Sequence, residues 1–300
     1  MTRFTDFLNQ SDTVLFPGGT GTELQRRGYK TTLPLWSASA VLDGYDLLTQ
    51  IHREYFQAGS DICIANTFRT TPRAFDKVGR KDEARHALKR ACDSAKEAAA
   101  SITDRPTFIG GSFAPLEDCY EPDLVPDDAT LIKEHTELAT WLADEGVDFL
   151  MPETINAKRE AIAMARAASH TGLPFIISFV VDKNGALLDG TPLSDVIAAT
   201  DLPGRVAISI NCRAIDVMNS AFDVLKANTD LPLGVYPNGI GHPHDDEGWI
   251  FENNPDSIDK FVNAAIGWKD RGAKIIGGCC GTTPDYIAAL SKAVRYPKAA

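Results

Sequence analysis

The sequence predicts a (β/α)8 barrel, and three observations support this fold class. Eight short apolar segments rich in β-branched and aromatic residues alternate with longer helical segments. The strand-like segments are nearly continuous apolar runs, which is typical of parallel strands buried on both faces. Several helical segments end at a glycine directly before the next strand, as expected for helix C-caps. An open doubly wound sheet is the alternative arrangement.

The strand segments are each seven to nine residues long and are predicted at 13–19, 60–68, 107–115, 147–154, 174–182, 205–212, 231–239 and 273–280. Helical periodicity is clearest at 47–59, 131–146, 157–172 and 258–272, which end at Gly59, Gly146, Gly172 and Gly272. Longer loops around 18–45, 113–128 and 238–256 follow strands. In a barrel such loops build the catalytic face.

The composition sets limits on the class of protein. We expect one domain over residues 1–300, since no linker or low-complexity tract divides the chain. A net charge of −11 argues against a nucleic-acid partner. No apolar run is long enough to span a membrane, and the first residues lack a secretory signal. The six cysteines should therefore remain reduced, which predicts a cytoplasmic protein, and a homo-oligomer is compatible with this composition.

Three cysteines stand at the ends of predicted strands. Cys212 ends the sixth strand, and Cys279 and Cys280 end the eighth. Adjacent cysteines pair poorly with each other, because their Cα atoms are too close for a relaxed disulfide. In a barrel the three thiols meet at one rim, where thiolates favour Zn²⁺ with a fourth position open to substrate. We expect Gly277 and Gly278 to give the bend that lets both thiols reach one ion.

Other candidate ligands are weaker. His242 and His244 lie in the loop after the seventh strand and form a second possible metal site. Cys63, Cys92 and Cys119 fit buried hydrophobic positions better than ligand positions.

The order of the motifs resembles the homocysteine S-methyltransferase family over nearly the whole chain. The most specific element is "GGCCGTTP" at the eighth strand together with "NC" at the sixth. Individually weaker matches precede or lie between these two elements: "GGTGTELQRRG" (18–28), "GSDICIANTFRTT" (59–71), "GSFAPLEDCY" (111–120), "PET" (152–154) and "YPN" (236–238).

The resemblance implies a zinc site at Cys212, Cys279 and Cys280 that holds homocysteine as a thiolate. It further implies that Glu153 and the backbone near Gly18 and Gly19 hold the amino-acid part of homocysteine. Asn66, Asn211 and Asn238 stand at strand ends, where they would orient substrate or brace the metal ligands. One position departs from the family, because Pro17 stands where its members usually have an aspartate. The acceptor-binding site therefore lacks one carboxylate, so either Glu153 alone recognises the amino group or the acceptor is not homocysteine itself.

The methyl donor expected by resemblance is a sulfonium, S-methylmethionine or S-adenosylmethionine. The chain shows neither the additional half of the folate- and cobalamin-using methionine synthases nor the extension of betaine-using relatives. Aromatic faces attract a sulfonium by cation–π interaction. The candidates in the rim loops are Trp36, Phe113, Tyr120 and Trp249.

Two other functions remain open at the level of sequence. The chain could serve as the barrel subunit of a corrinoid-dependent methyltransferase that works with a separate corrinoid protein. Alternatively, the three cysteines could form a structural or storage zinc site, which would be closed to homocysteine.

Overall fold

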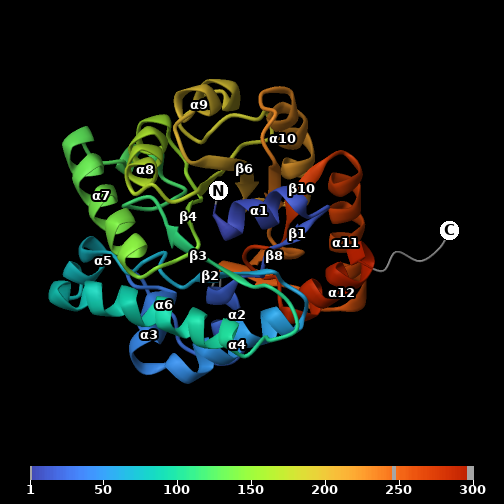
Figure 1. Cartoon of the computed structure of the whole chain (residues 1–300), viewed down its shortest axis with the longest axis horizontal. Coiled ribbons are helices and arrows are strands. Elements are labelled where there is room, and N and C mark those ends of the chain that lie inside the picture. Colours follow the sequence, from blue (N-terminus) through green and yellow to red (C-terminus); the bar gives the residue numbers. More distant parts are fainter. Residues whose placement is uncertain (1, 245–247, 296–300) are drawn as a thin grey trace.

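The architecture is a parallel eight-stranded barrel surrounded by helices (Figure 1). The computed structural model describes residues 2–244 and 248–295, without the side chains of 242–249. The strands follow one another in the order β1-β10-β7-β6-β5-β4-β3-β2. Their bounds are β1 Val14–Leu15, β2 Ile62–Ala65, β3 Phe108–Phe113, β4 Phe149–Pro152, β5 Phe175–Phe179, β6 Arg205–Asn211, β7 Leu233–Tyr236 and β10 Ala273–Ile276.

Each of these strands lies inside a segment predicted from the sequence, so the predicted fold class is confirmed. The seam between β1 and β2 is bridged by Asp61. Its amide donates to the carbonyl of Leu15 at 2.8 Å, and its carboxylate accepts from the amide of Leu15 at 2.8 Å. Asp61 therefore satisfies both backbone polar groups of Leu15 in β1, the shortest strand of the barrel.

Helices form the outer layer of the barrel (Figure 1). Those of the first half are α2 Thr20–Arg26, α3 Ala40–Asp43, α4 Tyr45–Gln57, α5 Pro72–Asp76, α6 Ala84–Ala100 and α7 Asp128–Asp144, with short 3₁₀ turns at Ser37–Ser39, Lys81–Glu83 and Pro122–Leu124. Those of the second half are α8 Lys158–His170, α9 Leu193–Ala199, α10 Ile215–Ala227, α11 Pro255–Asp270 and α12 Pro284–Arg295.

The four predicted glycine C-caps are confirmed. Gly59, Gly146, Gly172 and Gly272 have φ values of 107°, 68°, 75° and 108°. A residue with a Cβ would be strained in this left-handed region. These glycines let the chain reverse from each helix into the following strand.

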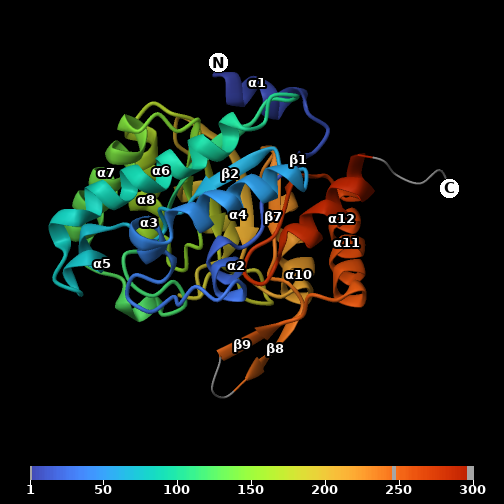
Figure 2. The ribbon, with the colours of Figure 1, turned by 90° about the horizontal axis from the view of Figure 1, so that it is seen from below.

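The amino-terminal end of the barrel is closed by α1 (Arg3–Gln10), and the carboxyl-terminal end carries a hairpin (Figure 2). The ring of Phe4 stacks on that of Phe149 at 4.2 Å and joins an apolar cluster inside the barrel. The hairpin, β8 (Gly241–His244) and β9 (Gly248–Phe251), is antiparallel and lies in a segment predicted only as a loop. Because α1 closes the amino-terminal end, the mouth at the carboxyl-terminal end is left for chemistry.

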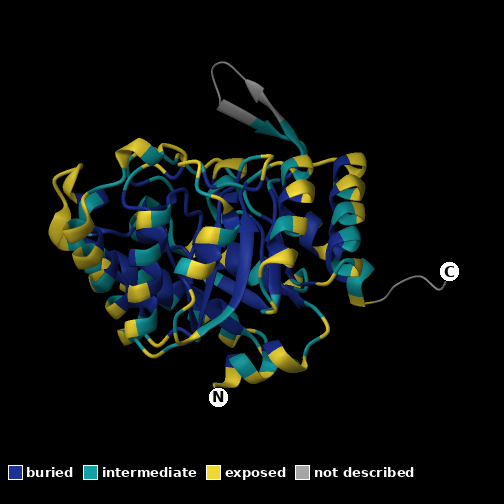
Figure 3. Ribbon diagram, turned by 90° about the horizontal axis from the view of Figure 1, so that it is seen from above, coloured by how far each residue is buried: buried dark blue, intermediate teal, exposed yellow. Residues whose placement is uncertain are grey.

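Burial differs between the inner layer of strands and the outer layer of helices (Figure 3). The strands are almost wholly buried, and the helices expose only their outer faces. A second and larger apolar cluster fills the space between strands and helices. No helix in the described residues combines the length and apolarity needed to cross a membrane.

Candidate metal centre

The three cysteines predicted to meet at the rim do so. The Sγ atoms of Cys212, Cys279 and Cys280 all lie within 4.8 Å of one another, and those of Cys212 and Cys280 are 3.8 Å apart. Among the residues the structure describes, this is the one group of three or more potential ligands with that spacing. Residues far apart in sequence thus form a compact thiol cluster, which we call the thiol triad.

Cys212 occupies a strained backbone position directly after β6. Its φ is 58°, which is uncommon for a residue with a side chain. Thr154, after β4, has a similar φ of 61°. Asn211 holds Thr154: its Oδ1 accepts from the amide of Thr154 at 3.3 Å, and its Nδ2 donates to Oγ1 of Thr154 at 2.9 Å. The amide of Cys212 donates to the carbonyl of Tyr236 at 3.2 Å. Strain of this kind persists where surrounding contacts hold it, and it directs the Cys212 thiol into the mouth.

Cys279 and Cys280 begin a tight turn after β10. The amide of Thr282 donates to the carbonyl of Cys279 at 3.2 Å, and Gly281 takes φ 75° within the turn. The turn is fastened to β7, since the amide of Cys279 donates to the carbonyl of Pro237 at 2.7 Å. The thiols of Cys279 and Cys280 can therefore face the same point although the two residues are adjacent in sequence.

The expected reason for the paired glycines was wrong. Neither Gly277 nor Gly278 has a positive φ, so no glycine-specific bend occurs there. Instead, a Cβ at Gly277 would lie 2.4 Å from Cβ of Phe16, and one at Gly278 would lie 2.1 Å from Oγ1 of Thr282. Both glycines are needed because other segments of the protein approach their Cα atoms closely.

The electrostatics of the thiol triad suit a bound cation. Hydrogen bonds from Cys279 and Cys280 hold the pKa of the Cys212 thiol well below its ordinary value. The pKa values of Cys279 and Cys280 are correspondingly raised well above theirs, first through their hydrogen bonds with Cys212. Ionisation of one thiol thus opposes ionisation of the other two, and a bound cation would favour the thiolate form of all three.

The hydroxyl of Tyr120 reaches the triad from the loop after β3. It donates to Sγ of Cys212 at 3.1 Å and to the carbonyl of Cys212 at 3.3 Å. The backbone amide of Tyr120 meanwhile donates to Oδ1 of Asp118 at 2.8 Å. One tyrosine side chain therefore spans the distance from the rim loop to the sulfurs.

A cavity of about 350 Å³ opens onto the triad. Pro17, Gly18 and Gly19 form part of its wall. It is further lined by polar and aromatic side chains from the loop after β1 and from four other strands or the segments that follow them, among them Trp36, Asn66, Arg69, Ser112, Asp118, Tyr120, Glu153 and Tyr236. The dimensions suit a small-molecule ligand.

Glu153 is the buried carboxylate of this cavity. It accepts hydrogen bonds from the hydroxyls of Ser112 and Tyr236, the latter at 3.1 Å. Burial raises the pKa of Glu153 to about 7, although these two hydrogen bonds favour the ionised form. The sequence singled out Glu153 but not Ser112 or Tyr236, since a serine or tyrosine inside an apolar strand gives no distinct signal.

The three asparagines occupy different environments. Asn66 lines the cavity, but its amide group is engaged by Ser37, whose Oγ donates to Oδ1 at 2.7 Å. Asn211 directly precedes Cys212 and is fully buried, so it is not placed to contact a substrate. Its hydrogen bond to Thr154 instead fits a bracing role. Asn238 lines a second cavity of about 1030 Å³, which adjoins the first at Trp36, Tyr120, Cys212 and Cys280.

The aromatic residues predicted to contact the methyl donor also occupy different environments. Trp36 and Tyr120 line both cavities. Phe113 was a wrong candidate: it is 1% exposed, and its ring packs 5.9 Å from that of His135 in the layer outside the barrel. The side chains of Trp249, His242 and His244 lie outside the described residues.

These features define a class of protein: a (β/α)8 barrel with a thiol triad and a buried carboxylate in one cavity at the carboxyl ends of its strands. The family model described as homocysteine S-methyltransferase matches residues 14–294. The chain belongs to the homocysteine S-methyltransferase family.

Relatives and solved structures agree along the whole chain. A homocysteine S-methyltransferase of Escherichia coli is 31% identical, covering 94% of this chain and 96% of that protein. A selenocysteine methyltransferase of Astragalus bisulcatus is 32% identical, covering 96% and 94%. The metallated crystal structure of the homocysteine methyltransferase MmuM from Escherichia coli superimposes with a TM-score of 0.82 at 29% identity, covering 95% of this chain and 98% of that one.

Proposed function

We propose that this protein transfers a methyl group from a sulfonium donor to the thiol of homocysteine, which yields methionine. The observation that carries this proposal is the thiol triad and Glu153 in one cavity. A thiol-reactive centre and an ammonium-binding carboxylate are the two features that recognition of an amino-acid thiol requires.

The triad fits a tetrahedral zinc ion. Zinc–sulfur bonds of about 2.3 Å in a tetrahedron place sulfurs about 3.8 Å apart. The distance between Cys212 and Cys280 is 3.8 Å without any rearrangement. Three thiolates leave one coordination position, and Cys212, Cys279 and Cys280 would hold the ion. When bound, zinc supplies a lowered pKa to a coordinated thiol near neutral pH.

Glu153 receives the α-ammonium group of the acceptor in this proposal. Its carboxylate is buried and already bonded to Ser112 and Tyr236, so it is fixed in position. Pro17 lines the same cavity without a side-chain charge, and its carbonyl accepts from the amide of Gly278 at 3.0 Å. Glu153 therefore replaces the pair of carboxylates that an aspartate at 17 would complete.

The chain needs no general base for the transfer itself. The donor sulfur is cationic and leaves as a neutral thioether, so its departure requires no proton. Glu153 holds the acceptor, and the polar wall around it keeps the thiol directed at the triad. We place the reaction in the cytoplasm, where the thiols stay reduced, with small molecules as its only required partners.

The purified protein, loaded with zinc, is the material for the test. With S-methylmethionine and homocysteine we expect two molecules of methionine per turnover, without cobalamin or folate. Chelation should abolish the activity and added zinc should restore it. Turnover with betaine or methyl-folate, or none with any sulfonium, would overturn the choice of donor. A zinc site that homocysteine leaves unchanged in X-ray absorption would overturn the choice of acceptor.

A further inference from the structure

Arg69 is an arginine of the thiol cavity that lacks an acidic partner. It is half-buried in the segment after β2 and lines the same cavity as the triad. Its Nη1 donates to the carbonyl of Glu117 at 3.2 Å, and its guanidinium lies 5.7 Å from the ring of Phe68. In the part of the chain that the structure describes, Arg69 forms no salt bridge.

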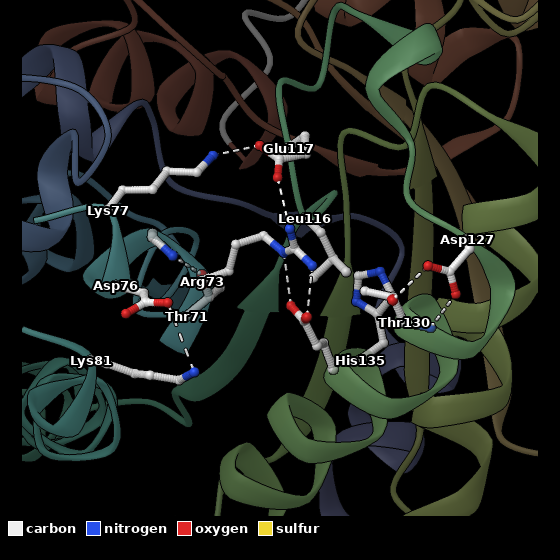
Figure 4. Close-up of polar contacts among 12 residues, drawn as sticks. Thr71, Arg73, Asp76, Lys77, Lys81, Leu116, Glu117, Asp127, Thr130 and His135 are labelled. Atoms are coloured by element: carbon white, nitrogen blue, oxygen red, sulfur yellow. Dashed lines mark hydrogen bonds and ion pairs between the residues drawn. The ribbon is translucent and has the colours of Figure 1, made fainter. Parts of the chain in front are cut away.

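The carboxylate of Glu117, whose backbone carbonyl contacts Arg69, is engaged by other cations. Figure 4 shows Lys77 and Arg73 both directed at Glu117. Oε1 of Glu117 accepts from Arg73 at 3.0 Å, and its other oxygen accepts from Lys77. Arg73 is in turn held by Glu134 at 2.7 Å. The charges beside Arg69 are thus balanced among themselves, and the guanidinium retains donors for a ligand.

Asp118 lines the same cavity on the adjacent loop and is exposed. Its Oδ1 accepts from the backbone amide of Tyr120, whereas Oδ2 has no hydrogen bond to a described residue. Asp118 and Arg69 do not pair with each other. Among the described residues, a cation and an anion that form no salt bridge with each other therefore line one cavity, and these two charges match those of a zwitterion.

One residue links Asp118 to the thiol triad. Tyr120 connects Asp118, through its amide, to Cys212, through its hydroxyl. Arg69, Asp118 and the triad line the same cavity. In this cavity a donor whose sulfonium faces the triad has Arg69 and Asp118 available for its amino-acid head group. Glu153, directly after β4, remains available for the acceptor.

We propose that Arg69 and Asp118 bind the α-carboxylate and the α-ammonium group of the methyl donor, and so select sulfonium donors that carry an amino-acid head group. This inference rests on the proposed function and names the donor class for the same cavity. Betaine has a carboxylate but no separate ammonium group, so it would leave Asp118 without a partner.

Calorimetric titration tests the proposal without turnover. S-methylmethionine and its methyl ester are titrated into the full chain and into Arg69→Gln, Arg69→Lys and Asp118→Asn. We expect the parent to bind the acid about tenfold or more tightly than the ester, which is the range of a hydrogen bond to a charged group. Arg69→Gln should lose this preference, and Arg69→Lys should keep part of it because the charge is retained. Asp118→Asn should weaken both ligands.

Arg80→Gln is the matched control, since it removes an arginine that pairs with Glu83 outside the cavity and leaves the contacts of Glu117 unchanged. It should keep the parent's preference, and thermal unfolding should confirm that each variant is folded. A parent without preference for the acid, or an Arg69→Gln variant that retains it, would overturn the inference. Steady-state kinetics separates the two proposals. If the parent is active but Arg69→Gln keeps the preference for the acid, only the proposed donor-binding role of Arg69 and Asp118 is wrong. If the parent is inactive but still distinguishes the acid from the ester, only the proposed methyl-transfer reaction is wrong.

Discussion

The hydroxyl of Tyr236, at the end of β7, donates a hydrogen bond to Oε2 of Glu153, at the end of β4, across 3.1 Å. The two residues come from strands that are not neighbours in the barrel. Ser112 of β3 donates to the other oxygen. A carboxylate that is 8% exposed is thereby oriented by groups from two different strands. This relationship gives two predictions.

The first prediction concerns stability and pH. Burial raises the pKa of Glu153 from 4.5 to about 7, so the folded protein retains a proton that the unfolded chain releases. The free energy that this group contributes is fully present below pH 4.5 and is lost as the pH rises to about 7. The difference amounts to about 3 kcal/mol. In urea unfolding from pH 5 to 8, Glu153→Gln should gain stability relative to the parent, and a constant difference would contradict the assignment.

The second prediction concerns the acceptor. Glu153→Gln should retain the fold and the metal but weaken homocysteine binding about 10- to 150-fold, because a hydrogen bond to a charged group is worth about 1.5–3 kcal/mol. The measurement is calorimetric titration of the zinc-loaded protein. Glu137→Gln, on the exposed face of α7, is the control and should bind as the parent does. Unchanged affinity in Glu153→Gln would place ammonium recognition elsewhere in the cavity.

The third prediction concerns the metal. We expect the parent to contain about one zinc ion per chain, and Cys280→Ala, which removes one sulfur of the triad, should lose most of it. Zinc content after dialysis is the measurement. Cys92→Ala removes a fully buried thiol in α6, away from the triad, and should keep its zinc. If Cys280→Ala retained zinc as tightly as the parent, the ligand assignment would be wrong.

The fourth prediction compares a glycine in a crowded turn with a glycine on an open face of a helix. Gly278→Ala would place a methyl group 2.1 Å from Oγ1 of Thr282, so the turn that carries Cys279 and Cys280 must shift. We expect a loss of stability of about 1–3 kcal/mol together with weaker zinc binding. Gly267→Ala, inside α11, meets no atom within 4 Å and should be stabilising by up to about 1 kcal/mol. Thermal unfolding and zinc titration of both variants are the measurements, and equal behaviour would refute the steric account.

Some features of this protein follow from the order of its residues alone. Continuous apolar segments must be buried on both faces, and alternation with helices then requires a parallel sheet. Once the sheet closes, the ends of its strands share one rim. For that reason Cys212, Cys279, Cys280 and Glu153 could be placed in one mouth before any coordinates were known.

Tertiary structure alone decided which side chains face that mouth. Successive residues of a strand point to opposite faces, and in an apolar strand buried on both sides the sequence does not distinguish the two. Ser112 thus faces Glu153 inside the barrel, whereas its neighbour Phe113 packs against His135 outside it. The pairing of Asn211 with Thr154, and the lack of a salt bridge from Arg69 to any described residue, depend likewise on loops from separate strands. Contacts between residues so distant in sequence have no local pattern, because the closed barrel creates them.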